Sequence, residues 1–99
     1  MRRIGLLKIG GVPIRIYERA GTTFWGEFDA EKRSIVVNAD QDRYLLISTL
    51  IHEISHAVDH LMLAGTKLAP ENRAQAMGAA LAACWDELTR IVNRKKVRR

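Results

Sequence analysis

The chain has 99 residues, 47% of them hydrophobic, without repeats or low-complexity tracts, which predicts one domain with a single core. No apolar run approaches the ~20 residues that cross a bilayer, and Lys8 and two glycines interrupt the N-terminal aliphatic stretch, so we expect a cytoplasmic protein without membrane contact. The net charge of +5 is concentrated at the C-terminus: the last six residues hold five of the 16 Lys and Arg, which leaves 11 bases against 11 acids before them.

The first forty residues predict strands and turns. The segments Ile4–Ile9 and Val12–Glu18 flank a Gly-Gly pair, which is typical of a hairpin. Thr22–Phe28 and Ser34–Asn38 are rich in aromatic and β-branched residues, and a polar turn joins them. We therefore predict a small antiparallel sheet of three or four strands, arranged as a meander.

The next segment changes to a helical period. Asn38 or Asp40 is the predicted N-cap of a helix that runs from about Gln41 to Leu63. Gly65 and Thr66 are expected to end this helix. Its predicted core face is entirely apolar and consists of Leu46, Leu50, Ile54, Ala57, Val58 and Leu61.

A second helix is predicted from Glu71 to about Val92, with Pro70 at an early helical position. The lone cysteine, Cys84, excludes an intramolecular disulfide. Its apolar neighbours favour a small buried side chain over a catalytic thiol. The predicted fold is α+β: a small sheet followed by a two-helix hairpin.

The segment LIHEISHAVDH, in the first helix, carries the candidate chemistry. His52 and His56 lie one turn apart on one face, where two imidazoles can bind one Zn²⁺ at about 2.0–2.1 Å each. Glu53 lies beside them and can take a proton from a water that the metal activates. The pattern predicts a zinc site with its own general base; the alternative is an amphipathic helix whose polar face happens to contain histidines.

Two further polar residues follow the motif. His60 lies about 12 Å along the axis from His52, too far for all three histidines to bind one ion. It is expected to border a substrate cleft, to stabilise an oxyanion or to be a polar rim residue. Asp59 can orient an imidazole, and helix capping or solvation is the competing interpretation.

The last six residues, RKKVRR, form a predicted basic tail (94–99) after a domain over residues 1–93. Such a tail can bind nucleic acid or an acidic partner. A frayed, solvated terminus is the preferred interpretation. Elsewhere we find no basic patch interleaved with aromatic residues, so we predict no nucleic-acid interface outside the tail.

The segments GEFDAEKRSIVVN and STLIHEISHAVDHL, followed by a second helix, resemble the small zincin-type metallopeptidases of phages and prophages, which are related to the ImmA/IrrE domain of the gluzincin class. The resemblance covers about residues 25–88. It implies a zincin-like domain in which His52 and His56 bind zinc and Glu53 is the general base and acid of peptide-bond hydrolysis. It also implies that a strand ahead of the active helix offers its edge to a peptide or protein substrate.

The third ligand departs from the family pattern. Gluzincins take it from an acidic residue on the following helix. Folding the two helices against each other is expected to place residues 75–81 opposite the histidines, and that stretch contains no carboxylate. Glu71 is the predicted third ligand, with Gln75 or a water as the competitor. The gap leaves open a non-catalytic zincin-like binding module with a degenerate metal site.

Overall fold

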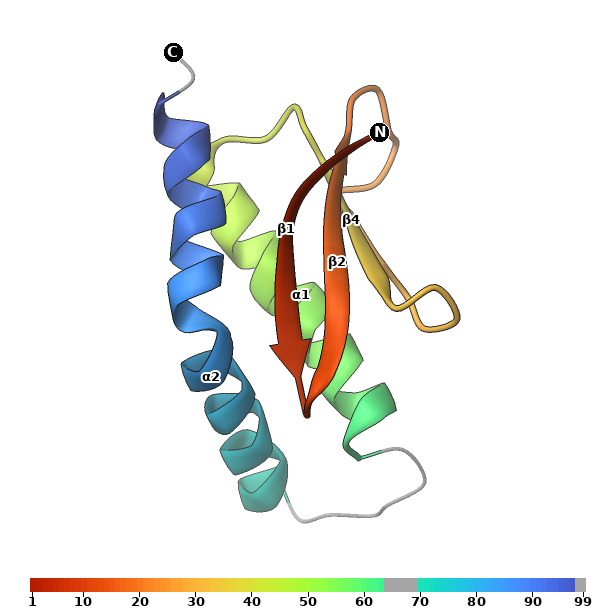
Figure 1. Cartoon of the computed structure of the whole chain (residues 1–99), viewed down its shortest axis with the longest axis vertical. Coiled ribbons are helices and arrows are strands. Elements are labelled where there is room, and N and C mark those ends of the chain that lie inside the picture. Colours follow the sequence, from red (N-terminus) through yellow and green to blue (C-terminus); the bar gives the residue numbers. More distant parts are fainter. Residues whose placement is uncertain (64–69, 98–99) are drawn as a thin grey trace.

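The computed structural model describes residues 1–63 and 70–97, and of residues 70 and 95–97 the backbone alone. The element order is β1 (Arg2–Ile9), β2 (Val12–Arg19), β3 (Gly26–Asp29), β4 (Ser34–Asn38), α1 (Arg43–Leu61) and α2 (Pro70–Val97). A four-stranded sheet is thus followed by two helices (Figure 1), which confirms the predicted α+β class. The predicted helix break at Gly65 and Thr66, and the last two residues of the predicted tail, lie outside the described residues.

The predicted hairpin of β1 and β2 is confirmed. The two strands pair antiparallel, with Ile9 opposite Val12. Gly10 and Gly11 have φ angles of 58° and 80°. Two successive positive φ values are what a two-residue turn of type I′ requires, and glycine adopts them without steric cost.

The predicted antiparallel meander is wrong in one pairing. The strand order is β1-β2-β4-β3, and β2 pairs with β4 in parallel, so the sheet is mixed. Ile35 and Val37 of β4 are at most 1% exposed. Because these side chains are buried, β4 has to be an inner strand, whereas the short and polar β3 is suited to an edge. The β3–β4 pair therefore joins β2 through β4.

Both helices begin close to where the sequence predicts. Asp42, and not Asn38 or Asp40, is the N-cap of α1, because its carboxylate accepts a hydrogen bond from the Leu45 N–H at 2.8 Å. Helix α2 begins at Pro70, as predicted, and continues through Val97, five residues beyond its predicted end. Residues 94–97 of the predicted tail are therefore helical.

The core lies between one face of the sheet and the two helices. The side chains on that face alternate with exposed ones along β1 and β2, as a half-buried sheet requires. The predicted core face of α1 is confirmed, with Leu61 partly buried and the other five residues buried. Among residues 1–63 and 70–97, no helix combines the length and the apolar character needed to cross a membrane.

Candidate metal centre

His52 and His56 lie together on the exposed flank of α1, as predicted. Their Nε2 atoms are 3.1 Å apart, and their rings meet edge to face with centroids 4.7 Å apart. A tetrahedral ion bound at roughly 2.0–2.1 Å by both nitrogens would hold them ~3.3 Å apart. The two nitrogens thus stand at nearly the spacing that a shared zinc requires. The same spacing suits one N–H···N hydrogen bond between two neutral imidazoles, so the pair is held in place with or without an ion.

Glu53 differs from the histidines in its environment. The side chain of His52 is 66% exposed, whereas that of Glu53 is 7% exposed, and Glu53 Oε2 lies 4.0 Å from His52 Nε2. Burial fixes the carboxylate at the base of the site while both imidazoles face outward. A carboxylate at this distance can hold one water between itself and the space that the two Nε2 atoms share.

The close approach of β3 to α1 depends on Gly26. A methyl group at this position would lie 2.5 Å from Thr49 Cγ2 and 3.1 Å from Glu53 Cγ. Any side chain here would push the strand from the helix or displace the Glu53 carboxylate. Gly26 therefore sets the depth of the candidate site, a role that the residues beside it in the sequence do not predict.

We expect Gly26→Ala to lower the free energy of unfolding by about 1–3 kcal/mol, because the added carbon overlaps with Thr49. Thr49→Ser removes the contacted methyl group and keeps the hydroxyl, so the double variant should regain part of the loss. Urea titrations of the four proteins measure this coupling. Gly78→Ala is the matched control: its methyl group would meet nothing within 4 Å, and it should be neutral or stabilising.

Gln41, a second residue whose role its sequence neighbours do not predict, connects three elements behind the site. It is 3% exposed, and its Nε2 donates to the carbonyl oxygens of Trp25 at 3.1 Å and Asn38 at 2.8 Å. Its Oε1 accepts a hydrogen bond from the Thr49 hydroxyl at 2.8 Å. Because a buried amide is costly without partners, this network fixes the start of β3 and the end of β4 against α1.

The edge of β3 is open beside the histidines. Asn38 N–H donates to Trp25 O at 2.8 Å, so the backbone groups of Trp25 face β4. Because such groups alternate in an antiparallel ladder, those of Gly26 and Phe28 face the open edge. The free edge predicted ahead of the active helix is thus that of β3, since β4 is an inner strand.

Two hollows flank Glu53. One, of about 490 Å³, is lined by described residues from β3, the turn after it and α1, including all three histidines. The other, of about 330 Å³, lies on the side of Trp25 and Leu45.

The expectation that residues 75–81 of α2 lie opposite the histidines is wrong. Ala76, Met77, Ala80 and Leu81 pack against the core instead. The histidines line the larger hollow together with residues of β3. Helix α2 lies against α1 and β1 instead (Figure 1).

The predicted third ligand is not brought to the histidines. Glu71 is exposed in the first turn of α2. Among the described residues, no three His, Cys, Asp or Glu side chains are grouped so that they could hold a metal. Arg73, two positions after Glu71, pairs with Asp59 at 2.7 Å, so the start of α2 lies beside the end of α1. Glu71 as a zinc ligand stays a prediction.

The remaining polar residues of the motif have other contacts. Asp59 pairs with Arg73 and not with an imidazole. The His60 ring meets the edge of Phe28, with centroids 6.1 Å apart, and lines the larger hollow. His60 is thus a rim residue beside the open strand. Cys84 is 4% exposed, and desolvation by burial raises the pKa of its thiol, as is typical of a small buried side chain.

A comparison of the chain with known proteins finds no matching family model, no matching curated protein and no matching solved structure.

Proposed function

We propose that this protein is a zinc-dependent peptide hydrolase that acts in the cytoplasm, with the metal held by His52 and His56. The observation that carries the proposal is the pair of Nε2 atoms, 3.1 Å apart and exposed, above a buried carboxylate whose Oε2 lies 4.0 Å from His52 Nε2. Zinc, when bound, lowers the pKa of a coordinated water towards neutrality and polarises a carbonyl group.

The chain's own residues supply the proton transfers and the orientation. Glu53 accepts a proton from the attacking water at Oε2 and then donates it to the nitrogen of the departing amine. Burial beside Gly26 keeps this carboxylate in place during both steps. Because the imidazoles of His52 and His56 are exposed, the site is open to solvent and substrate on their side.

The open edge of β3 offers a way to position an extended peptide. The outward backbone groups of Gly26 and Phe28 can pair with a substrate main chain, whose scissile bond would then lie beside Glu53. The two hollows on either side can receive substrate side chains, and Trp25, which is 55% exposed, offers an apolar contact in the smaller one. Main-chain pairing of this kind favours unfolded or flexible protein segments as substrates.

The alternative function is a non-catalytic zincin-like module that binds peptides. The observation that favours it is that, among the described residues, no acidic side chain lies beside the two histidines as a third ligand. A site with two imidazoles alone would bind zinc more weakly than the three-ligand sites of catalytic zinc enzymes.

We expect the purified protein to bind about one equivalent of zinc at neutral pH and to cleave an unfolded substrate such as casein. His52→Ala and His56→Ala should each abolish zinc binding, because a single imidazole is a weak ligand. His60→Ala is the matched control, since His60 contacts Phe28 and should leave zinc binding unchanged. Elemental analysis after gel filtration measures the zinc. Zinc binding without cleavage would favour the binding module, and no zinc binding in the wild type would refute both.

A further inference from the structure

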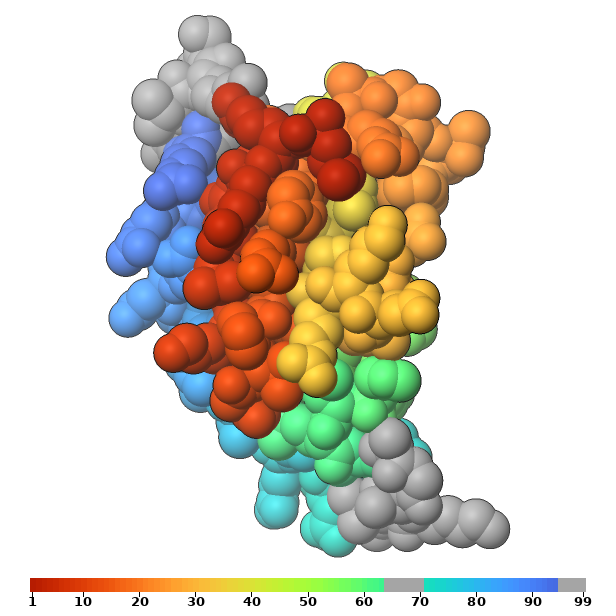
Figure 2. All heavy atoms as spheres, turned by 45° about the vertical axis from the view of Figure 1, so that its right-hand side comes forward, coloured from red at the N-terminus to blue at the C-terminus, as the bar shows by residue number. Residues whose placement is uncertain are grey.

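The second face of the sheet carries a separate feature, because both helices cover the other face. Figure 2 shows β1, β2 and β4 side by side on this outer surface, with α2 (blue) along the left side and α1 (green) below. Ile14 and Ile16 of β2 point into the core and are 0% exposed. Since side chains alternate along a strand, Arg15, Tyr17 and Arg19 point outward.

Tyr17 lies at the centre of three arginines on this face. Arg15 and Arg19 are two residues before and after it on β2, and Arg3 is its partner on β1. Partners across a strand pair have Cβ atoms about 4.5–5.5 Å apart, and neighbours at i±2 lie about 7 Å away. The half-buried Tyr17 ring is thus within reach of three exposed guanidinium groups. We call these four residues the Tyr17 cluster.

The charges of the Tyr17 cluster are not neutralised by the described part of the chain. Arg3, Arg15 and Arg19 form no ion pair with a carboxylate there, and the Arg19 guanidinium donates a long hydrogen bond to the sulfur of Met1, at 3.6 Å. The described arginines that do pair with acids are Arg2, Arg73 and Arg90. Lys8 adds a further exposed charge on β1. Three neighbouring unpaired cations repel one another, and an anionic ligand would relieve this repulsion.

The acids of the outer face lie apart from the cluster. Glu27 is opposite Val36, which is itself the partner of Tyr17 on β4, so Glu27 lies two strands away, ~9.5 Å at the usual strand spacing. Asp29 lies on the same edge strand. The face is therefore divided into a basic half on β1 and β2 and an acidic edge on β3, which would keep a polyanion on the first two strands.

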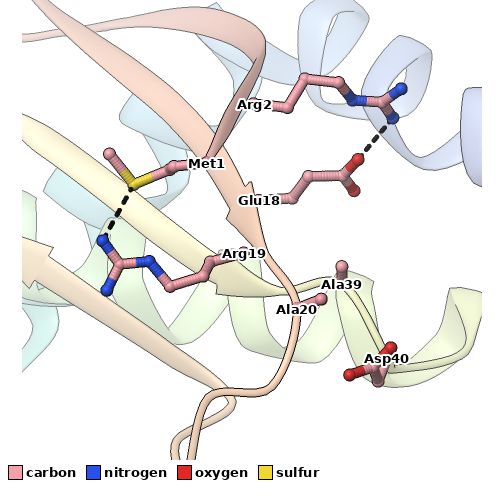
Figure 3. A pocket seen from close by; sticks show the side chains of 7 residues that line it. All are labelled: Met1, Arg2, Glu18, Arg19, Ala20, Ala39 and Asp40. Atoms are coloured by element: carbon pink, nitrogen blue, oxygen red, sulfur yellow. Dashed lines mark hydrogen bonds and ion pairs between the residues drawn. The ribbon is translucent and has the colours of Figure 1, made fainter.

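A hollow of about 610 Å³ adjoins the cluster at Arg19. Figure 3 shows Arg19 directed towards the Met1 sulfur, while Arg2 and Glu18 form an ion pair on the other side and Asp40 lies at the far end. The weak contact with sulfur leaves the guanidinium of Arg19 able to turn towards a phosphate.

We propose that the Tyr17 cluster binds single-stranded nucleic acid, with phosphates on Arg3, Arg15 and Arg19 and a base stacked on Tyr17. Single-strand binding combines a positively charged track for the backbone with an aromatic ring for the bases. The open sheet face supplies both within two strands. This proposal corrects the expectation that no basic patch interleaved with aromatic residues occurs outside the C-terminal tail. The segment IRIYER alternates Arg and Tyr with the period of a strand. This inference does not depend on the metal centre.

The test uses fluorescence anisotropy of the full chain with a labelled 20-nucleotide oligo-dT and with the corresponding RNA. We expect the triple variant Arg3→Gln, Arg15→Gln, Arg19→Gln to bind at least tenfold more weakly. The slope of log affinity against log salt should fall by about 2, as for three lost phosphate contacts. Arg73→Gln, Arg90→Gln, Arg94→Gln is the matched control with the same loss of charge on α2, and it should retain binding.

A second pair of variants tests the stacking contact at constant charge. Tyr17→Leu keeps an apolar side chain of similar burial but removes the ring, and it should weaken binding about tenfold or more. Tyr17→Phe keeps the ring and should bind like the wild type. Circular dichroism and urea titration establish that all variants are folded. Three results would overturn the proposal. The first is no binding by the wild type. The second is an equal loss in both triple variants, which would indicate a general polyanion effect or the C-terminal tail. The third is unchanged binding by Tyr17→Leu, which would indicate contact with the phosphates alone and no stacked base.

Discussion

Replacement of Glu53 by Gln is expected to reduce peptide hydrolysis by about 10²–10⁴-fold while the protein keeps its zinc. A positioned general base contributes a factor of that size, and an amide cannot accept the proton. Gln fits the same space beside Gly26, so the fold should be unchanged. The measurement is the initial rate of cleavage of a fluorogenic peptide library by zinc-loaded protein, with zinc content determined on the same samples.

Glu27→Gln is the matched control for this experiment. Glu27 of β3 borders the same hollow, but it is exposed and its side chain points to the outer face of the sheet, away from the histidines. Glu27→Gln removes the same charge from the protein as Glu53→Gln and leaves the proposed base in place. Equal rates for the wild type and Glu53→Gln would show that a contaminating protease is measured or that Glu53 is not the base.

Zinc is expected to raise the melting temperature by about 10–20 °C when free zinc is present at 100 times its dissociation constant. A ligand that binds only the folded state stabilises it by about 2.7 kcal/mol under this condition, and a chain of this size gains about 4–8 °C per kcal/mol. A chelator should reverse the shift. Differential scanning calorimetry measures both, and His52→Ala should show no shift with zinc.

The same measurement identifies the third ligand. If Glu71 binds the ion, the first turn of α2 must move towards the histidines, and Glu71→Gln should remove most of the thermal shift. If Gln75 is the ligand, Gln75→Ala should do so instead. A shift that survives both variants would show that a water completes the site. Glu31→Gln, an exposed change in the turn between β3 and β4, is the control for surface charge.

The elements that depend on local sequence were predicted well. The Gly-Gly turn, the apolar face of α1 and the position of His52 and His56 on one face of the helix all follow from spacing along a single segment. The parallel pairing of β2 with β4 did not follow, because it depends on how much apolar surface each strand must bury, which is decided only in the assembled core.

Two residues of the candidate site could not be predicted from the sequence for the same reason. Gly26 and Gln41 act through atoms on other elements: Thr49 and Glu53 for the glycine, and Trp25 and Asn38 for the amide. Nothing in the residues beside them in sequence indicates these contacts. The expected placement of α2 opposite the histidines was wrong because α2 also covers β1 and therefore lies on the other flank of α1.

The contact between Gly5 of β1 and Ile91 of α2 has a consequence for folding during synthesis. A methyl group at Gly5 would lie 2.5 Å from Ile91 Cδ1, so β1 fits closely against a late turn of α2. While the ribosome still holds that turn in its exit tunnel, the inner face of the first hairpin has no cover on this side. Nascent chains of this protein should therefore expose aliphatic side chains until residue 91 emerges, and this surface is a binding site for chaperones during that interval.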